Sequence, residues 1–276
     1  HRLRAFLTML GISVDMFAGT IIFPLANSFE ASITSNLSSL GNTVLYIHNR
    51  PWKDNSQDWF KYFNRPKVSY QDFIKLKSEL KNVIGVSFEA TKNGVTIKNG
   101  NRSIDGVRLR GVTFDYSRIN NLNFRNGRFF SQVEIEAGRN VCVLGNTIGR
   151  VLFGNSNPEG RMVLIRGKQF QVIGLLEKEG SLDIFGGGND EQILLPFGAI
   201  GKMSNTSKRG VDKVITVKAV SYELMPQVES DITGLIRNNR GLKPGSEDNF
   251  SINKQEALIE QLNNIFKALN TGGAVI

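Results

Sequence analysis

The sequence predicts an α+β protein in which an α/β unit is split by an inserted β-rich unit and is carried on two helices that continue into a membrane. Three observations predict this fold class. A long apolar run lies near the start of the chain, two strand–helix–strand patterns stand far apart, and the stretch between them has short strands punctuated by glycine.

The apolar run extends from Phe6 to Leu25. It has about the 20 residues that a helix needs to cross a bilayer. Asp15 and Pro24 interrupt it, and a carboxylate near the middle of a span costs about 2.5–3.5 kcal/mol on insertion scales. The alternative is a buried helix of a soluble domain. Because the apolar length favours the membrane, we expect residues 1–25 to form a first transmembrane helix, complete or partial.

The flanks of this run predict its orientation. Arg2 and Arg4 precede it, whereas the other flank has no Lys or Arg until Arg50. Cations are retained on the cytoplasmic side. We therefore expect a cytoplasmic amino end and an extracytoplasmic main domain. The sequence has no initiator methionine, so we expect it to be a piece of a longer protein.

Two amphipathic helices are expected beside the membrane, over residues 26–41 and 254–270. Apolar residues recur in both every three or four positions. We expect the helices to lie side by side as a stalk, each covering the apolar stripe of the other. The candidate packing residues are Phe29, Ile33, Leu37, Leu258, Leu262, Ile265 and Leu269. Residues 271–276 turn apolar and are expected to start a second transmembrane helix.

Two strand–helix–strand patterns predict the α/β unit, which we assign to residues 42–92 and 211–253. Both have β-branched strands and a helix with one apolar face. The first pattern has strands at Thr43–His48 and Val83–Ala90 around a helix that begins at Ser69. The second has strands at Val214–Val220 and Asn249–Ile252 around a helix at Tyr222–Asn238.

Residues 93–210 are expected to form the inserted β-rich unit. Short apolar strands alternate there with glycine and asparagine, and Asn99-Gly100 is a strong hairpin signal. We expect Gly186–Gly188 to be a flexible tip. A loop with five aromatic residues precedes the first helix, and we expect these residues to anchor it to the core rather than to form an exposed patch. They are Trp52, Trp59, Phe60, Tyr62 and Phe63.

No catalytic, cofactor or metal site is expected. The chain has two histidines, and its single cysteine, Cys142, stands among apolar residues, as a buried structural thiol does. The carboxylate pairs Glu134/Glu136 and Glu177/Glu179 are expected on solvated loops or strands. Gly167-Lys168 is followed by Gln169, so it does not fit a P-loop that would bind ATP.

The net charge of +9 raises the question of a nucleic-acid partner. Nucleic-acid binding would require Lys and Arg clustered on one element, and here they are scattered along the chain. We therefore expect no nucleic-acid partner. Attraction to an anionic surface and solubility are the simpler interpretations of this charge.

Several segments resemble the MacB/FtsX-type ABC transporter permeases. RLRAFLTMLGISV, then SFEASITSNLSSLG followed by VLYI, is similar to the start of these permeases. GRFFS, VCVLGNTIGRVLFG, NPEGRMVLIRGKQFQVIGLLEKEG and ILLPF resemble their periplasmic core domain, in the same order. The resemblance covers essentially the whole chain. It implies a porter-like α/β part split by a sabre-like β-rich insert, on a stalk between the first two transmembrane helices, although Asp15 and Pro24 depart from the smoother span of the family.

The resemblance implies a non-catalytic permease subunit of the bacterial inner membrane with a periplasmic main domain. Its partners would be an ABC ATPase subunit or domain, a second permease copy and membrane lipid. It also allows a periplasmic adaptor and an outer-membrane channel. The implied function is to couple cytoplasmic ATP hydrolysis to conformational change for export or extraction of a substrate. The alternatives are an FtsX-type regulatory or signalling module that controls a periplasmic partner, and a membrane-anchored secreted enzyme.

Overall fold

The computed structural model describes residues 4, 6, 9–11, 13, 43–52, 59–179, 188–203 and 210–254. The chain divides into two compact units, His1–Gly41 with Gln255–Ile276, and Asn42–Lys254. In the first unit only the few residues near the amino end are described, and they are helical. Most of the expected first transmembrane helix, the first stalk helix, residues 271–276 and the second stalk helix after Lys254 lie outside the described residues. Lys254, the expected first residue of the second stalk helix, ends strand β10 instead. Among the residues that are described, no helix is long and apolar enough to cross a membrane.

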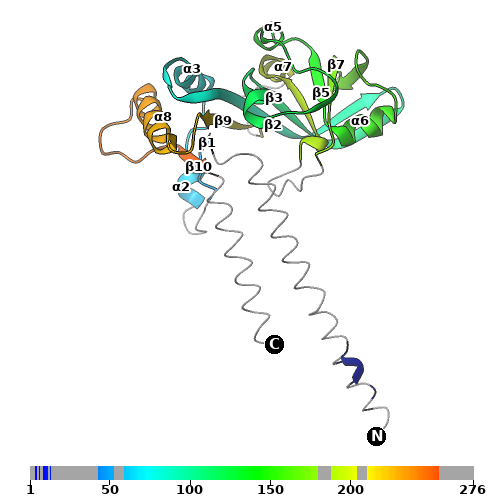
Figure 1. Cartoon of the computed structure of the whole chain (residues 1–276), viewed down its shortest axis with the longest axis horizontal. Helices are drawn as coiled ribbons and strands as arrows, with labels where there is room; N and C mark the ends of the chain where they lie inside the picture. The colour runs from blue at the N-terminus through cyan, green and yellow to red at the C-terminus, as the bar shows by residue number, and fades with distance from the viewer. Residues whose placement is uncertain are drawn as a thin grey trace. The chain divides into compact units, whose positions relative to one another are not determined.

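The second unit is built on one ten-stranded mixed sheet with the order β10-β1-β9-β2-β3-β8-β5-β7-β4, and β6 pairs with both β2 and β7 (Figure 1). The strands are β1 Val44–His48, β2 Val83–Asn99, β3 Arg102–Val112, β4 Phe124–Gly127, β5 Val141–Leu144, β6 Met162–Ile165, β7 Lys168–Leu176, β8 Gln192–Pro196, β9 Asp212–Ala219 and β10 Ser251–Lys254. The helices are α2 Trp59–Phe63, α3 Tyr70–Glu79, α4 Tyr116–Asn120, α5 Gln132–Glu136, α6 Asn146–Phe153, α7 Phe197–Met203 and α8 Met225–Asn239, with a 3₁₀ turn, η1, at Asn189–Glu191.

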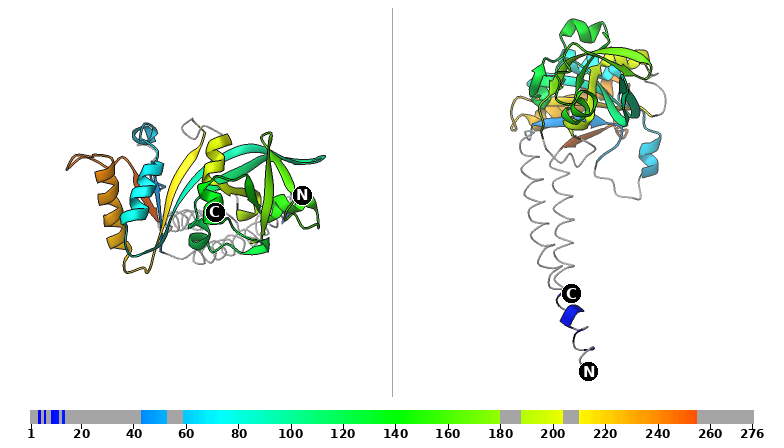
Figure 2. Two further views of the ribbon diagram at one scale, coloured as in Figure 1. Left: turned by 90° about the horizontal axis from the view of Figure 1, so that it is seen from above. Right: turned by 90° about the vertical axis from the view of Figure 1, so that its right-hand side faces the viewer.

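At one end of the sheet, β10, β1, β9 and the first half of β2 run antiparallel to their neighbours. The helices α3 and α8 lie side by side on one face of these strands (Figures 1 and 2). Their buried side chains, including Phe73, Leu76, Val228 and Ile232, form one core with the sheet residues. We call this the first core.

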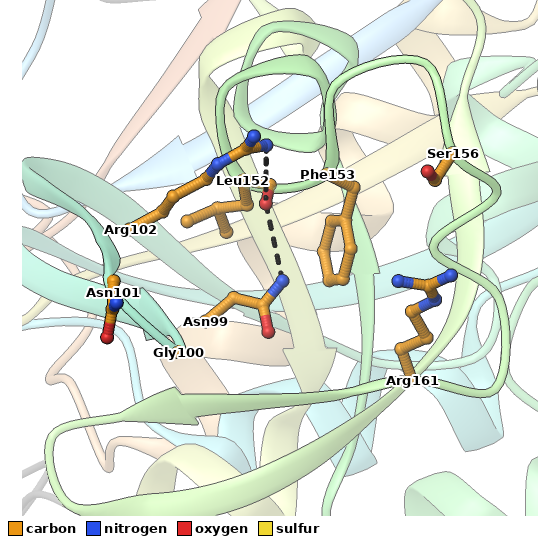
Figure 3. A pocket seen from close by; sticks show the side chains of 8 residues that line it. All are labelled: Asn99, Gly100, Asn101, Arg102, Leu152, Phe153, Ser156 and Arg161. Carbon is orange, nitrogen blue, oxygen red and sulfur yellow. Dashed lines mark hydrogen bonds between the residues drawn. The ribbon is translucent and has the colours of Figure 1, made fainter.

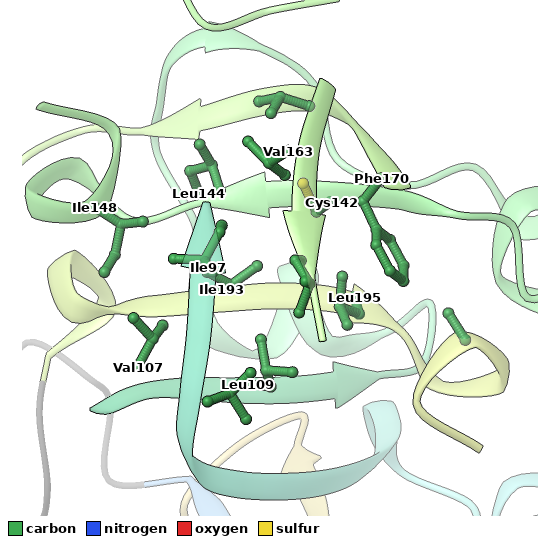
Figure 4. Close-up of a cluster of buried hydrophobic side chains, with 14 of the residues drawn as sticks. Ile97, Val107, Leu109, Cys142, Leu144, Ile148, Val163, Phe170, Ile193 and Leu195 are labelled. Atoms are coloured by element: carbon green, nitrogen blue, oxygen red, sulfur yellow. The ribbon is translucent and has the colours of Figure 1, made fainter. Parts of the chain in front are cut away.

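At the other end the strands close into a ring. The path β2-β3-β8-β5-β7 returns to β2 through β6, which pairs with β7 over its whole length and with β2 at Ile97 and Lys98. The side chains inside this ring, among them Ile97, Leu109 and Phe170, form the second core (Figure 4). The helices α6 and α7 add Ile148 and Ile200 to it.

The outer face of the ring is also covered. Cys142 and Leu144 of β5 belong to the second core, whereas Val141 and Val143 belong to a third cluster with residues of α4 and α5. Successive side chains of a strand point to opposite faces, so β5 is buried on both sides. This explains why the VCVL segment is a continuous apolar run rather than an alternating one.

Several sequence predictions are confirmed. The first predicted strand is β1, and the Asn99-Gly100 turn joins β2 to β3 with Gly100 at φ +56°. Ser69 is the N-cap of α3, where it forms a capping box with Asp72. Cys142 is fully buried. Gly167-Lys168 lies at the connection between β6 and β7.

The strand predicted at Val83–Ala90 is much longer in the structure, because β2 continues to Asn99. The sequence KNG at 92–94 resembles a turn, but the structure has an irregular register there, between Lys92 and Val95. Gly94 takes the left-handed conformation at φ +72°, which glycine adopts without steric cost. The strand therefore bends at this point and enters the ring without ending.

Two other expectations are wrong. Glu134 and Glu136 lie in helix α5 rather than on a loop or strand, and Ser131 with Glu134 forms its capping box. In the aromatic loop, Trp52 contacts Tyr46 at a ring-centroid distance of 4.8 Å, but Phe60 and Phe63 are 67% and 71% exposed and do not anchor the loop to the core. The division into residues 42–92 with 211–253 and 93–210 stays a prediction.

Candidate functional site

The candidate packing residues of the stalk, Phe29 to Leu37 and Leu258 to Leu269, lie outside the described residues. The candidate site that the structure does describe is the part of the sheet between the paired strands β1 and β10 and the ring. It has three parts, which are the β1–β10 attachment, an ion pair between α3 and α8, and the junction between the first and second cores.

The chain enters the second unit on β1 and leaves it on β10, and these two strands pair with each other from Leu45↔Lys254 to His48↔Ser251. Asn253 closes the pair, because its side chain accepts from Trp52 N at 2.8 Å and donates to Arg50 O at 3.2 Å. On the other side of β1, which pairs with β9, His48 Nε2 lies 2.9 Å from Asp212 Oδ1 of β9. The chain segments before β1 and after β10 are thus attached to adjacent strands that are hydrogen-bonded to each other.

A buried ion pair holds α3 to α8. Asp72 Oδ2 accepts from Arg240 Nη2 at 2.7 Å and from Ser69 N at 2.9 Å, and Asp72 Oδ1 accepts from Asn239 Nδ2 at 2.7 Å. Burial alone would raise the pKa of Asp72, but the hydrogen bonds from Arg240, Ser69 and Asn239 bring its pKa below the ordinary value of 3.8. The Asp72 carboxylate is therefore charged, and both of its oxygens accept hydrogen bonds. It joins α3 to the end of α8 over the first core.

The junction between the two cores has a polar half on β2, β3 and β9. Glu89 accepts from Thr216 Oγ1 at 2.5 Å and from Arg110 Nη1 at 3.4 Å, and Arg110 Nη1 also donates to Tyr116 OH at 3.1 Å. Burial raises the pKa of Glu89, and the Arg110 charge and the Thr216 hydrogen bond oppose this shift only in part. These hydrogen bonds lie in a buried site, where they are stronger than in water. They join β2, β3, β9 and α4.

The aromatic half of the junction consists of Tyr70, Phe73, Phe88 and Phe197. Phe197 begins α7 and packs against both the first and the second core. Its ring stacks on Tyr70 at 5.0 Å and 8°, and meets Phe88 edge-on at 4.9 Å. These are favourable geometries for aromatic pairs. Phe197 therefore links α7 of the ring to α3 of the first core.

Sequence reasoning missed the junction. The segment ILLPF was noted only for its resemblance to the family, and nothing local in it indicates that Phe197 meets Tyr70, which lies more than a hundred residues away. In the polar half, Glu89 and Thr216 are likewise 127 residues apart, whereas Glu89 and Arg110 are separated by 21 residues. A charged residue at a β position otherwise occupied by apolar residues, as Glu89 is between Phe88 and Ala90, was the available signal.

Two side chains that the sequence analysis considered as possible catalytic groups, Cys142 and Glu134, have pKa values that do not suit catalysis. The thiol of Cys142 is buried, which raises its pKa far above the range in which it would be a nucleophile. A bidentate ion pair with Arg128 holds the pKa of Glu134 at about 2. This carboxyl therefore cannot act as a general acid near neutral pH. No group of three metal-ligating side chains occurs among the described residues.

A family model described as the MacB-like periplasmic core domain matches residues 5–235. The chain belongs to this family. It is therefore a MacB-like periplasmic domain from the permease part of an ABC-type transporter, as the resemblance in the sequence had implied.

Curated relatives agree with the MacB family. The macrolide export ATP-binding/permease protein MacB of Wolinella succinogenes is 26% identical over 259 residues, covering 94% of this chain and 38% of the relative. The MacB protein of Vibrio parahaemolyticus is 26% identical over 254 residues, covering 92% of this chain and 36% of the relative. The chain thus spans less than half of the length of these relatives.

Solved structures share the fold. The periplasmic region of MacB from Actinobacillus actinomycetemcomitans matches with a TM-score of 0.65 and 19% identity, over 83% of this chain and 96% of that one. The extracellular domain of the ABC-type transporter YknZ from Gram-positive bacteria matches with a TM-score of 0.58 and 19% identity, over 76% and 98% of the two chains. The MacB-like mixed α/β fold is common to all three.

Proposed function

We propose that this MacB-like domain carries movement from the membrane side of an ABC transporter permease to its periplasmic side, so that cytoplasmic ATP hydrolysis drives export or extraction of a substrate. ATP hydrolysis belongs to a separate domain or subunit in this proposal, which agrees with the match of the chain to a periplasmic rather than a nucleotide-binding family.

The observation that carries the proposal is the pairing of β1 with β10. A relative displacement of the two segments attached to these strands pulls on this ladder. Because β1 also pairs with β9, and β9 with β2, the displacement is passed along the sheet to the junction. Interdigitated cores deform little, so the displacement is transmitted rather than absorbed.

The proposed assembly has two permease copies in the inner membrane with the described unit in the periplasm. The partners are an ABC ATPase and membrane lipid, with a periplasmic adaptor and an outer-membrane channel in organisms that have an outer membrane. The names of the curated relatives, which include export, ATP-binding and permease, support the transport role over the regulatory alternative. No described feature specifically favours the FtsX-type role.

A disulfide across the proposed stalk tests this function. In the full-length transporter with its ATPase, Ile33→Cys and Leu262→Cys would be combined and oxidised, with each single variant as a control. Cys142 is fully buried and adds little background. We expect cross-linking to abolish export, to leave ATP binding intact, and to be reversed by a reductant. Unchanged export by the fully cross-linked protein would contradict the proposal that the stalk transmits movement to the periplasmic unit.

A further inference from the structure

A cavity of about 500 Å³ lies where the tip of the β2–β3 hairpin meets the end of α6 (Figure 3). It lies at the opposite end of the β2–β3 pair from the junction residues Glu89 and Arg110, and the proposed transport role does not use it. Its lining residues are Asn99, Gly100, Asn101, Arg102, Leu152, Phe153, Ser156 and Arg161.

One wall of the cavity is held rigid by hydrogen bonds. Asn99 Nδ2 and Arg102 Nη1, on either side of the hairpin turn, both donate to Leu152 O at 3.3 Å (Figure 3). This carbonyl is one of the last in α6 and has no partner within the helix. The two donors therefore fix the hairpin on the helix end. Arg102 uses one nitrogen in this contact, and its other guanidinium donors remain available to a ligand.

The second cation of the cavity is Arg161. Its guanidinium carbon lies 6.0 Å from the centroid of the Phe153 ring. Its main chain is fixed, because Arg161 N donates to Pro158 O at 3.1 Å and Arg161 O accepts from Val172 N at 2.8 Å. Within the part of the chain that the structure describes, no carboxylate or carbonyl accepts from its guanidinium. The main chain of Arg161 is thus fixed in position, and the N–H donors of its charged guanidinium are available to a ligand.

The balance of charge at the cavity is positive. Two guanidinium groups line it and no lining residue is acidic. The carboxyl end of α6 contributes the equivalent of about half a negative charge, which opposes an anion. Two full positive charges exceed this, and the Leu152 carbonyl already accepts two hydrogen bonds. The cavity therefore favours an anionic ligand over a cationic one.

We propose that this cavity binds a small organic oxyanion, a carboxylate or a phosphate monoester. The guanidinium fork of Arg161 matches the oxygens of such a group. The side chains of Leu152 and Phe153 are only 1% and 6% exposed, so the accessible lining is mainly polar, and Asn101 and Ser156 offer hydrogen bonds. The volume lies within the range of small-molecule sites, about 300–1,000 Å³.

The test uses phenyl phosphate and benzoate as probes, observed by saturation-transfer NMR with the full chain at low ionic strength. We expect saturable binding of one or both probes. Phenyltrimethylammonium, which has the same ring and the opposite charge, should not bind.

A pair of variants with equal net charge locates the site. Arg161→Gln should weaken binding about tenfold or more, the effect of losing a charge-assisted hydrogen-bonding partner. Arg150→Gln removes an exposed arginine of α6 that does not line the cavity, and should leave binding unchanged. Arg102 is left intact because it also holds Leu152. Thermal unfolding of both variants shows whether they remain folded.

Three results would overturn the proposal. The first is the absence of saturable binding by phenyl phosphate and benzoate. The second is equal binding by the wild-type protein and the Arg161→Gln variant. The third is an equal loss in both variants, which would indicate a general attraction to the positive charge of the chain rather than a site.

Discussion

At the scale of single residues, the most consequential side chain in the first core is Asp72. It is 1% exposed, caps α3 and accepts hydrogen bonds from the residues that end α8. A buried carboxylate is tolerated only when its oxygens are satisfied by charged or polar donors. Asp72 therefore connects two helices that are more than 140 residues apart in sequence, although the sequence indicated only a helix that begins at Ser69.

Replacing Asp72 with Asn should destabilise the protein by about 3 kcal/mol, because Arg240 would be left buried without its anionic partner. The measurement is chemical unfolding at pH 7. Glu79→Gln on the same helix is the control. It removes the exposed Lys75–Glu79 pair and should cost no more than about 0.5 kcal/mol. Equal losses in the two variants would contradict the clamp role of Asp72.

The same pair predicts a dependence on pH. The pKa of Asp72 is lowered in the folded protein, so its ionisation stabilises the fold at every pH above the unfolded value of about 3.8. This contribution should be lost as the pH falls from 3.8 through the lower folded pKa. We expect the stability difference between wild type and Asp72→Asn to be constant from pH 5 to 7 and to shrink below pH 4. A difference that grew on acidification would show that the sign of the shift is wrong.

At the scale of elements, the corner between β5 and α6 depends on close backbone packing against η1. A Cβ on Gly145 would lie 2.3 Å from Asn189 O and 2.4 Å from Asp190 O, which are main-chain atoms. Gly145→Ala should therefore force the two elements apart and destabilise the protein by about 1–3 kcal/mol. The midpoint of thermal unfolding measures this loss.

The matched control is Gly234→Ala in α8. No atom lies within 4 Å of the Cβ position there, and alanine is favoured over glycine inside a helix by about 1 kcal/mol. This variant should be as stable as the wild type or more stable. If Gly145→Ala behaved in the same way, close contact at the β5–α6 corner would not constrain the fold.

Elements defined by local signals could be predicted, whereas those defined by distant partners could not. The alternation in VLYIH and the capping box at Ser69 depend on neighbouring residues, so the sequence alone located β1 and α3. The closing of the ring depends on β6 pairing with two strands that precede and follow it, which no local pattern encodes. Phe197 could be predicted to be apolar, but its partner Tyr70 is chosen by the tertiary fold. The stalk, predicted from periodicity, remains to be tested.

At the scale of the whole molecule, the continuous sheet means that the two cores are joined by main-chain hydrogen bonds and by the junction. The aromatic half of the junction adds side-chain contacts that span β2, α3 and α7. If transport depends on movement passed through this region, loss of these contacts should affect export more than ATP hydrolysis.

Phe197→Ala tests this link in the full-length transporter. We expect export to fall about tenfold or more while ATP hydrolysis continues, since a smaller side chain leaves a cavity between the two cores. Val133→Ala, on the exposed face of α5, should change neither quantity. Equal reduction of hydrolysis and export by Phe197→Ala would instead indicate general loss of the folded protein.

The position of β1 between β9 and β10 also has a consequence for synthesis. His48 is made 164 residues before Asp212, its partner on β9, and β10 follows later still. At roughly 5–20 residues per second, the first strand waits about 8 to 33 s on the ribosome without either neighbour in its ladder. VLYIH is an apolar strand with two unpaired edges during this interval. Nascent chains of this protein should therefore depend on a chaperone until the last strand has emerged.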